Sequence, residues 1–390
     1  MPVLNRIAEF HADMTGWRQD LHAHPEIGLQ ETRTAGVIAD LLRGFGVDEV
    51  HTGMAKTGVV GVIHGTGPGE AIGLRADIDA LPILEETGKP YASRTKGVMH
   101  ACGHDGHTAM LLGAARYLAE TRNFAGTTYV IFQPAEENFG GANLMVREGL
   151  FERFPMRQVF GMHNWPTVPA NTFKWRNGPV MAAVATIEIV ITGKGAHGAQ
   201  PHLGTDPILI AAAIVQALQS IVARNVSPLQ GSVVTIGSIH GGNAHNVIPE
   251  TVRMLGTARW FDPAVADALE QGVLRLSRGI AESFGATADA KFERIYPATV
   301  NDAEAMEMSR AAAVSVVGNG RVEEMEFPTM GGEDFSFMLN AKQGAYIMLG
   351  SARGGDDAGL HHPQYDFNDD VLPTGASYWA TLVEQQLPRR

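Results

Sequence analysis

The sequence predicts an α/β protein with two domains, and three observations support this fold class. Its 390 residues exceed one ordinary domain, and 45% hydrophobic with 18% charged residues is enough apolar material for sizeable cores. Strand-like and helical segments alternate over most of the chain. Residues 184–294 instead follow the order β-α-β-β-α-β, the pattern of a small α+β sandwich. We therefore expect a discontinuous larger domain, 1–183 with 295–390, and an inserted second domain, 184–294.

The individual elements follow from residue spacing, composition and breaker residues. Apolar residues at helical spacing predict helices over 4–20, 31–45, 108–121, 207–223, 263–284, 300–317 and 373–386. Apolar, β-branched or alternating runs predict strands over 59–63, 71–74, 127–132, 158–162, 184–192, 232–239, 252–260, 287–294 and 345–349. Glycine and proline separate many of these segments, so most candidate polar residues fall in loops at strand ends.

The charge and cysteine content limit the classes of partner. A formal net charge of −12 and a pI of about 5.7 argue against nucleic acid or an anionic membrane surface as a partner. The longest apolar run, Ile208–Val215, is too short for a membrane span. One cysteine and no visible secretory signal favour a cytoplasmic location. The apolar surface of the helix over 207–223 predicts a homodimer contact, with packing on its own sheet as the alternative.

One stretch, His100–His107, combines the only cysteine of the chain with three histidines and an aspartate. Thiolate and imidazole are the side chains that bind borderline-soft divalent metal ions best. Cys102 and His104 are separated by a single glycine, so a turn could bring both to one ion. The alternative is a buried free cysteine beside solvated histidines, since a free cysteine is usually a small core residue.

Two aspartates follow the strand predicted over 71–74, at the kind of strand end where open α/β sheets keep their active sites. Asp77 and Asp79 alternate with apolar residues, so both side chains could face the same side. The alternative for each is a helix cap or an ordinary turn carboxylate.

Two adjacent glutamates, Glu136 and Glu137, follow the strand predicted over 127–132 and lie beyond Pro134. Adjacent carboxylates can divide labour, because one can hold a metal ion while its neighbour takes a proton from metal-bound water. The alternative is a solvated acidic turn. His163 ends the next predicted strand and is either a ligand or a structural histidine.

Candidate metal ligands therefore recur at strand ends and in glycine- or proline-rich loops. They are Cys102, His104, Glu137, His163 and one of His361 or His362. Five residues at the same kind of position favour a hydrolytic site with two metal ions, which share a bridging group and activate water. Mixed sulfur, nitrogen and oxygen donors allow zinc, manganese, nickel or cobalt.

Eight motifs, in order along the chain, carry a resemblance to a known family: residues 73–82, 100–107, 133–137, 161–166, 195–197, 243–249, 331–335 and 360–363. They look like those of the M20 metallopeptidase family, in particular its amidohydrolase branch, which includes hippurate hydrolase, N-acyl-amino-acid hydrolases and auxin-conjugate hydrolases. The likeness extends from about Leu21 to Asn368. It implies a di-metal aminopeptidase-like catalytic domain with an inserted lid or dimerisation domain.

The resemblance also implies a role for each candidate ligand. Cys102 would bridge the two ions, where many relatives outside this branch use an aspartate. The terminal ligands would be His104, Glu137, His163 and His361. His361 is the histidine of a Leu-His-x-Pro motif, and His362, at its variable position, is the alternative.

Four further residues have roles that the resemblance implies. Glu136 would act as the general base and then as the general acid. Asp77 would orient a metal ligand from behind. Other members of the family carry a histidine two residues before this aspartate, where this chain has Arg75. From the inserted domain, His197 and Asn246 would reach the scissile carbonyl or the substrate carboxylate, a contact that can cross the dimer in relatives.

The implied activity is hydrolysis of the amide bond of N-acyl amino acids by a metal-bound hydroxide, giving a carboxylic acid and a free amino acid. By analogy with the branch, the acyl group is aromatic or apolar, as in hippurate. The alternatives are a dipeptidase or aminopeptidase of the same family, and a non-catalytic metal-dependent binding protein. The residues by themselves predict only a metal-assisted hydrolase.

Overall fold

The computed structural model describes residues 4–389, and these form two compact units. The first unit contains the described residues up to Val180, Val300–Pro328 and the described residues from Asp334 onward. The second unit contains Met181–Thr299 and Thr329–Glu333. The use of one unit for catalysis and of the other as a lid or dimerisation domain stays a prediction.

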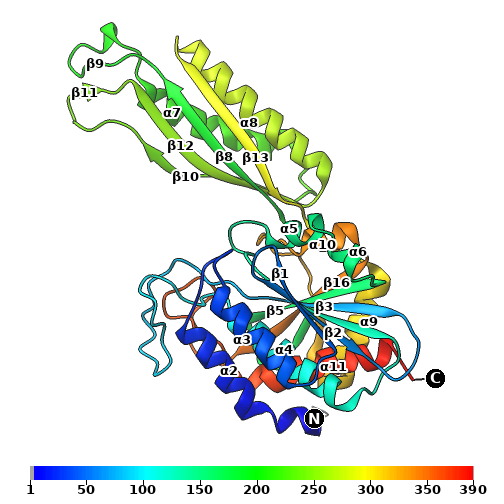
Figure 1. The fold of residues 1–390 in the computed structure, drawn as a ribbon. Coiled ribbons are helices and arrows are strands. Elements are labelled where there is room, and N and C mark those ends of the chain that lie inside the picture. The colour runs from blue at the N-terminus through cyan, green and yellow to red at the C-terminus, as the bar shows by residue number, and fades with distance from the viewer. Residues whose placement is uncertain (1–3, 390) are drawn as a thin grey trace. The chain divides into compact units, whose positions relative to one another are not determined.

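An eight-stranded sheet forms the centre of the first unit (Figure 1). Its strands, in spatial order, are β1 Glu49–Met54, β2 Gly58–His64, β4 Thr127–Gln133, β3 Ala71–Asp77, β5 Gln158–Pro169, β16 Gly344–Ala352, β6 Phe173–Trp175 and β15 Val322–Glu324. The four central strands, β4, β3, β5 and β16, run parallel, so their carboxyl ends meet at one edge of the sheet. The prediction that a strand ends before His163 is wrong, because β5 continues through His163 to Pro169 in register with β16.

Helices pack against this sheet (Figure 1). They are α1 Asn5–Ala8, α2 His11–Ala23, α3 Thr32–Gly44, α4 His104–Thr121, α5 Gly141–Arg147, α6 Leu150–Arg153, α9 Ala303–Val317, α10 Ser336–Ala341 and α11 Leu372–Gln386. The single helix predicted over 4–20 is wrong, because a turn between α1 and α2 interrupts it and places Phe10 in the core. A short pair, β7 Gly178–Met181 with β14 Thr299–Asn301, lies where the chain passes between the units.

Helix α4 carries His104 at its N-terminus, and most of its residues are buried. It begins at His104, one turn before the predicted start, because Gly103 takes a positive φ of 95° that turns the chain into the helix. A Cβ atom at Gly113 would lie 2.3 Å from the Met14 sulfur, so α4 and α2 pack closely. The Tyr117 hydroxyl donates to Glu384 Oε1 at 3.0 Å and ties α4 to α11. This packing fixes the N-terminus of α4, where His104 lies.

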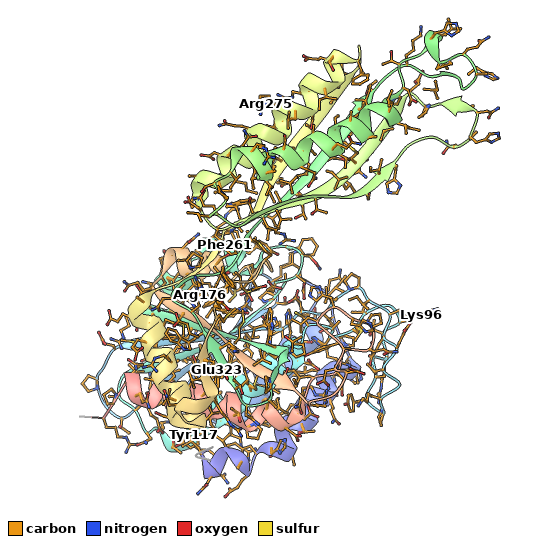
Figure 2. The ribbon with its side chains drawn as sticks, turned by 180° about the vertical axis from the view of Figure 1, so that it is seen from behind. Lys96, Tyr117, Arg176, Phe261, Arg275 and Glu323 are labelled. Atoms are coloured by element: carbon orange, nitrogen blue, oxygen red, sulfur yellow. The ribbon has the colours of Figure 1, made fainter. Side chains whose placement is uncertain are left out.

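The second unit is a four-stranded antiparallel sheet with two long helices (Figure 1). In chain order its main elements are β8 Ala183–Thr192, α7 Pro207–Ser220, β10 Ser232–His240, β12 Thr251–Trp260, α8 Pro263–Ser283 and β13 Thr287–Tyr296. The predicted β-α-β-β-α-β order is therefore confirmed. The apolar faces of both helices share a core with the sheet, while Arg275 of α8 is exposed (Figure 2). A short ladder of β9 Ala196–His197 with β11 Val247–Ile248 is an addition that the sequence pattern did not predict.

One helical stretch within the described residues, Pro207–Asn225, has the length and composition of a membrane span. It consists of α7 and a π-helical turn over Ile221–Asn225. Ile210 and Ile214 of this stretch belong to the core of the second unit, whereas Ile208 and Leu209 are exposed. A helix of a globular core passes the same test of length and composition, so this observation is weak evidence for a membrane span.

Candidate metal centre

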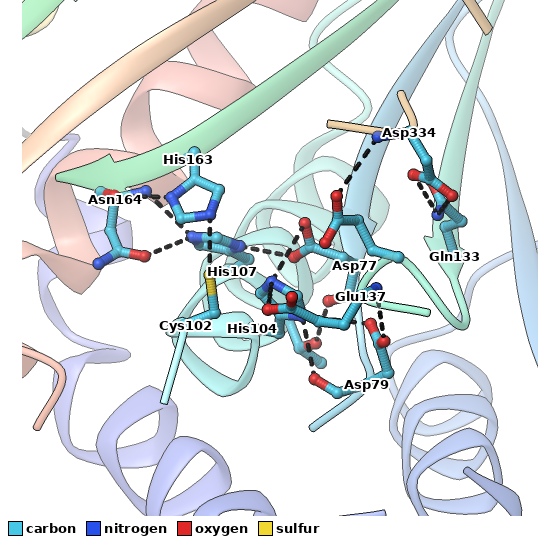
Figure 3. A network of polar contacts seen from close by, with 12 residues as sticks. Asp77, Asp79, Cys102, His104, His107, Gln133, Glu137, His163, Asn164 and Asp334 are labelled. Carbon is cyan, nitrogen blue, oxygen red and sulfur yellow. Dashed lines mark hydrogen bonds and ion pairs between the residues drawn. The ribbon is translucent and has the colours of Figure 1, made fainter. Parts of the chain in front are cut away.

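Most of the predicted site residues of the first unit meet at the carboxyl edge of its parallel strands (Figure 3). Asp77 is the last residue of β3, and His163 lies within β5. Glu136 and Glu137 follow β4, and Cys102 lies in the loop that leads into α4. Elements far apart in the sequence therefore supply sulfur, nitrogen and oxygen donors to one place.

The thiol of Cys102 and the imidazole of His163 face each other. Sγ lies 3.3 Å from Nε2, and both residues are buried. The Nδ1–H of His163 donates to the carbonyl oxygen of Asn164 at 2.7 Å, which leaves Nε2 as the nitrogen directed at the sulfur. A Cβ atom at Gly103 would lie 2.4 Å from Asn164 Oδ1, so only glycine allows this close approach of the cysteine loop to β5.

His104 is held through one nitrogen and leaves the other available. Its Nδ1–H donates to Asp79, with 2.9 Å to the carbonyl oxygen and 3.2 Å to Oδ1. Its Nε2 is buried and makes no hydrogen bond within residues 4–389. This nitrogen lies 3.8 Å from Asp77 Oδ2 and 3.9 Å from Glu137 Oε1. Such an arrangement is typical of a metal-binding histidine, whose second nitrogen is fixed by a carboxylate or carbonyl.

Asp79 is hydrogen-bonded to His104, whereas Asp77 Oδ2 lies 3.8 Å from the Nε2 of that histidine. Besides its contacts to His104, Asp79 accepts a hydrogen bond from the Glu137 backbone N–H at 3.0 Å. Asp77 instead accepts from His107 Nδ1 at 2.6 Å. The sequence alone allowed Asp79 to be either a site residue or an ordinary turn carboxylate. Its hydrogen bond to His104 is seen only in the folded structure. The orienting role predicted for Asp77 stays a prediction.

Of the two histidines that the sequence left as alternatives, only His361 approaches the other donors. Its Nε2 lies 3.2 Å from Glu137 Oε1. Its backbone N–H donates to Ala101 O at 2.7 Å, and its φ of 63° turns the ring toward Glu137. Both histidines are exposed, but the Nδ1 of His362 accepts from the Gln364 backbone N–H at 3.1 Å instead of approaching Glu137. The geometry therefore favours His361 as the ligand.

The donors group into overlapping sets that fit divalent metal ions. In each set the candidate ligand atoms lie within 4.8 Å of one another. Three such sets are Cys102 with His104 and His163, Cys102 with Glu137 and His361, and His104 with Glu136 and Glu137. The first two sets together contain all five candidate ligands and share only Cys102, which is the position that a bridging ligand needs. Thiolate, imidazole and carboxylate together suit borderline divalent metals such as zinc.

Burial and neighbouring carboxylates shift the pKa values of the candidate ligands. Burial raises the pKa of the Cys102 thiol, and the carboxylate of Glu137 raises it further. Burial lowers the pKa of His104, but the surrounding carboxylates, first that of Asp77, outweigh burial and raise this pKa to about 10. Burial lowers the pKa of His163 well below its usual value. A divalent cation would compensate the negative charge that surrounds these donors.

Arg75 occupies the strand position where the resemblance places a histidine in other members. Its guanidinium is fully buried and donates to Gln133 Oε1 at 2.7 Å, Asp77 Oδ2 at 2.9 Å and Asp334 Oδ1 at 3.1 Å. Gln133 and Asp334 lie in two of the motifs that carry the resemblance, but the sequence predicted no role for either residue. Arg75 thus supplies a fixed positive charge behind the donors rather than a metal ligand.

Glu136 lies beside the donors and is 7% exposed. Its Oε1 accepts from the Asp334 backbone N–H at 3.3 Å, so the carboxylate has a fixed orientation. A carboxylate that is adjacent to metal ligands and shielded from bulk water is suited to proton transfer.

The predicted substrate-binding residues of the second unit are neighbours within that unit. His197 in β9 pairs with Val247 in β11, and the Gly198 backbone N–H donates to Asn246 O at 2.7 Å. The side chains of His197 and Asn246 are exposed. Their role in binding substrate stays a prediction.

A buried thiol, imidazole nitrogens and carboxylates at the carboxyl edge of a parallel sheet, with the shielded carboxylate of Glu136 beside them, are typical of a metal-dependent hydrolase. Comparison with known proteins agrees with this class. A family model described as peptidase family M20/M25/M40 matches residues 73–385. The chain belongs to this family and is a metal-dependent amidohydrolase.

Individual relatives cover almost the whole chain. A hippurate hydrolase of Campylobacter jejuni is 39% identical over 387 residues, which are 99% of this chain and 100% of that protein. An N-acetylcysteine deacetylase of Bacillus subtilis is 38% identical over 375 residues, 96% of this chain and 97% of that protein. A similar solved structure is that of the Bacillus subtilis YXEP protein, described as a dinuclear metal binding peptidase from the M20 family. It matches with a TM-score of 0.82 and 35% sequence identity, and the match covers 97% of this chain and 99% of that chain. The predicted family and fold class are confirmed.

The geometry of the two adjacent histidines gives a direct prediction. Because His361 Nε2 lies 3.2 Å from Glu137 Oε1 whereas His362 Nδ1 is bonded to the Gln364 backbone, His361→Ala should weaken metal binding by about 100-fold or more, since even residues behind the ligands typically contribute 10- to 100-fold. His362→Ala should leave the affinity within about twofold of the wild-type value. Competition with a coloured chelator measures both. An equal loss in the two variants, or a loss in His362→Ala alone, would contradict the assignment.

Proposed function

We propose that this amidohydrolase cleaves N-acyl amino acids with an aromatic or apolar acyl group, such as hippurate, to a carboxylic acid and a free amino acid. The single observation that carries the proposal is the cluster of thiol, imidazole and carboxylate donors, most of them buried, with Glu136 beside it. The names of two relatives, a hippurate hydrolase and an N-acetylcysteine deacetylase, support N-acyl amino acids as the substrate class.

Five side chains would hold two divalent metal ions: Cys102, His104, Glu137, His163 and His361. We propose that Cys102 would be shared by both ions, because it is the only residue common to the set with His104 and His163 and the set with Glu137 and His361. When bound, the ions would polarise the scissile carbonyl and lower the pKa of water. The donor chemistry is compatible with zinc, manganese, nickel or cobalt.

Glu136 would move the proton in this reaction. Its carboxylate would accept a proton from the attacking water, whose oxygen joins the acyl carbon, and would donate that proton to the leaving nitrogen as the C–N bond breaks. The hydrogen bond from the Asp334 backbone N–H holds Oε1 in place for both transfers. Low exposure limits exchange of the transferred proton with bulk water.

The second unit would contribute to substrate binding and to assembly. We propose that His197 and Asn246 contact the scissile carbonyl or the substrate carboxylate, because a histidine and an amide can donate hydrogen bonds to either. The exposed Ile208 and Leu209 of α7 support a homodimer contact through this unit. Sedimentation velocity tests that contact, since a chain that remains monomeric at every concentration contradicts it.

We also propose a small-molecule substrate as the partner and the cytoplasm as the location of the chain. A net charge of −12 favours a small-molecule substrate over nucleic acid, whose phosphates would be repelled. A cytoplasmic location would keep the single cysteine reduced and available for metal.

A substrate panel tests the proposal against its main alternative, a dipeptidase or aminopeptidase. The metal-loaded chain should hydrolyse N-benzoylglycine and release glycine, with unprotected dipeptides turned over at least about tenfold more slowly, a difference of about 1.4 kcal/mol in activation free energy. The YXEP protein, which is named a peptidase, gives the alternative its support. Cleavage of dipeptides alone would overturn the substrate class, and metal binding without any turnover would favour a binding protein.

A further inference from the structure

His107 lies in the first turn of α4, is 2% exposed, and has no part in the functions described above. Both of its ring nitrogens are engaged. Nδ1 donates to Asp77 Oδ1 at 2.6 Å, and Nε2 contacts Asn164 twice, with its side-chain Oδ1 at 2.7 Å and its backbone nitrogen at 3.0 Å. His107 therefore has no free nitrogen for a metal ion, although it is surrounded by candidate ligands (Figure 3).

The contact to Asp77 leads toward His104. The second oxygen of this carboxylate, Oδ2, lies 3.8 Å from His104 Nε2 and accepts from Arg75 at 2.9 Å. The carboxylate is fully buried, so the hydrogen bond from His107 and the ion pair with Arg75 together set its orientation. The position of Asp77 in turn limits where His104 can place its free nitrogen.

The contact to Asn164 leads toward His163. The carbonyl oxygen of Asn164 accepts from His163 Nδ1 at 2.7 Å, and its side-chain amide is hydrogen-bonded to the Tyr365 hydroxyl at 2.6 Å. The rings of His107 and His163 also pack edge to face, with centroids 4.5 Å apart. The direction of His163 Nε2 therefore depends on residues that His107 holds.

We propose that His107 is a positioning residue that holds two metal-binding histidines, His104 and His163, in one mutual geometry through Asp77 and Asn164. It bridges the carboxyl end of β3 and strand β5 from the first turn of α4, so three elements are tied at the metal centre. This inference rests on the proposed metal centre and assigns to it a residue that does not contact the ions. Residues of this kind typically contribute 10- to 100-fold to metal affinity.

Three substitutions separate the two contacts. An asparagine amide can take the place of Nδ1 and a glutamine amide the place of Nε2, so His107→Asn keeps the bond to Asp77 and His107→Gln keeps the bond to Asn164. His107→Leu removes both. The matched control is His100→Leu, which deletes another buried imidazole of the same segment, one whose nitrogens make no hydrogen bond within residues 4–389.

The measurements are the cobalt affinity of each variant by chelator competition, the thiolate-to-cobalt absorption, and the melting temperature of the metal-free chain. We expect His107→Leu to lose about 10- to 100-fold in affinity and to shift the absorption, with His107→Asn and His107→Gln each losing less. The control should keep the wild-type affinity and absorption. A merely structural role would lower only the melting temperature.

Two results would overturn the inference: wild-type affinity and absorption in His107→Leu, or an equal loss in the His100→Leu control. If His107→Leu does not fold, the inference is instead overturned when both His107→Asn and His107→Gln keep the wild-type affinity. Failure of the wild-type chain to bind cobalt would instead remove the proposed metal centre itself, and this inference with it.

Discussion

Replacing Glu136 by glutamine is expected to lower kcat by about 10²- to 10⁴-fold while the chain keeps its metal ions. The glutamine amide has nearly the same shape as the carboxylate but cannot accept and return a proton. The proposed metal ligands are Cys102, His104, Glu137, His163 and His361, so metal content should not change although Glu136 lies close to His104 and Glu137. Steady-state rates with N-benzoylglycine, together with the metal content of the purified variant, measure the two effects separately.

The matched control for this variant is Glu152→Gln, which makes the same chemical change at an exposed position of α6. It should keep the wild-type rate, because exposed substitutions far from special features have small effects. Full activity in Glu136→Gln would remove Glu136 as the general base. Loss of metal together with activity would instead make it a ligand.

Replacing Cys102 by alanine is expected to lower metal affinity by about 100-fold or more, since the change removes a donor that two ligand sets share. Cys102→Asp should retain more affinity than Cys102→Ala, because a carboxylate can also bind two ions. Isothermal titration of the metal-free chains with zinc measures both affinities and the number of ions bound. The wild-type chain should bind two ions.

The melting temperature of each metal-free cysteine variant controls for damage to the fold, because Cys102 is buried. The prediction concerns the increase in melting temperature on adding zinc, which should be large in the wild type and small in Cys102→Ala. Equal increases in both chains would show that the thiol is not a metal ligand.

Much of the fold could be predicted because long, strongly patterned elements follow from spacing alone. The strands and helices of the second unit, such as the one at Pro263–Ser283, have clear periodicity and proline or glycine boundaries. Strands of three residues, such as Phe173–Trp175 and Val322–Glu324, were missed because so short a segment carries no period. The end of β5 was misplaced because pairing with β16 extends it beyond the apolar run.

The candidate ligands could be predicted because cysteine, histidine and glutamate residues in loops at strand ends form a pattern that the sequence itself shows. The residues that orient these ligands could not be predicted from the sequence. Asp79 acts on a histidine 25 positions away, and His107 contacts Asn164 across 57 positions. Such contacts depend on how β3, β5 and α4 pack against one another, and a local sequence pattern does not predict this tertiary packing.

The most direct measurement is anomalous X-ray diffraction from crystals of the zinc-loaded chain, recorded above and below the zinc absorption edge. Two strong anomalous peaks should lie within bonding distance of Cys102 Sγ, with His104, His163, Glu137 and His361 completing their surroundings. Peaks located elsewhere, or a cysteine sulfur with no metal ion beside it, would contradict the assignment of these five residues as the catalytic metal centre.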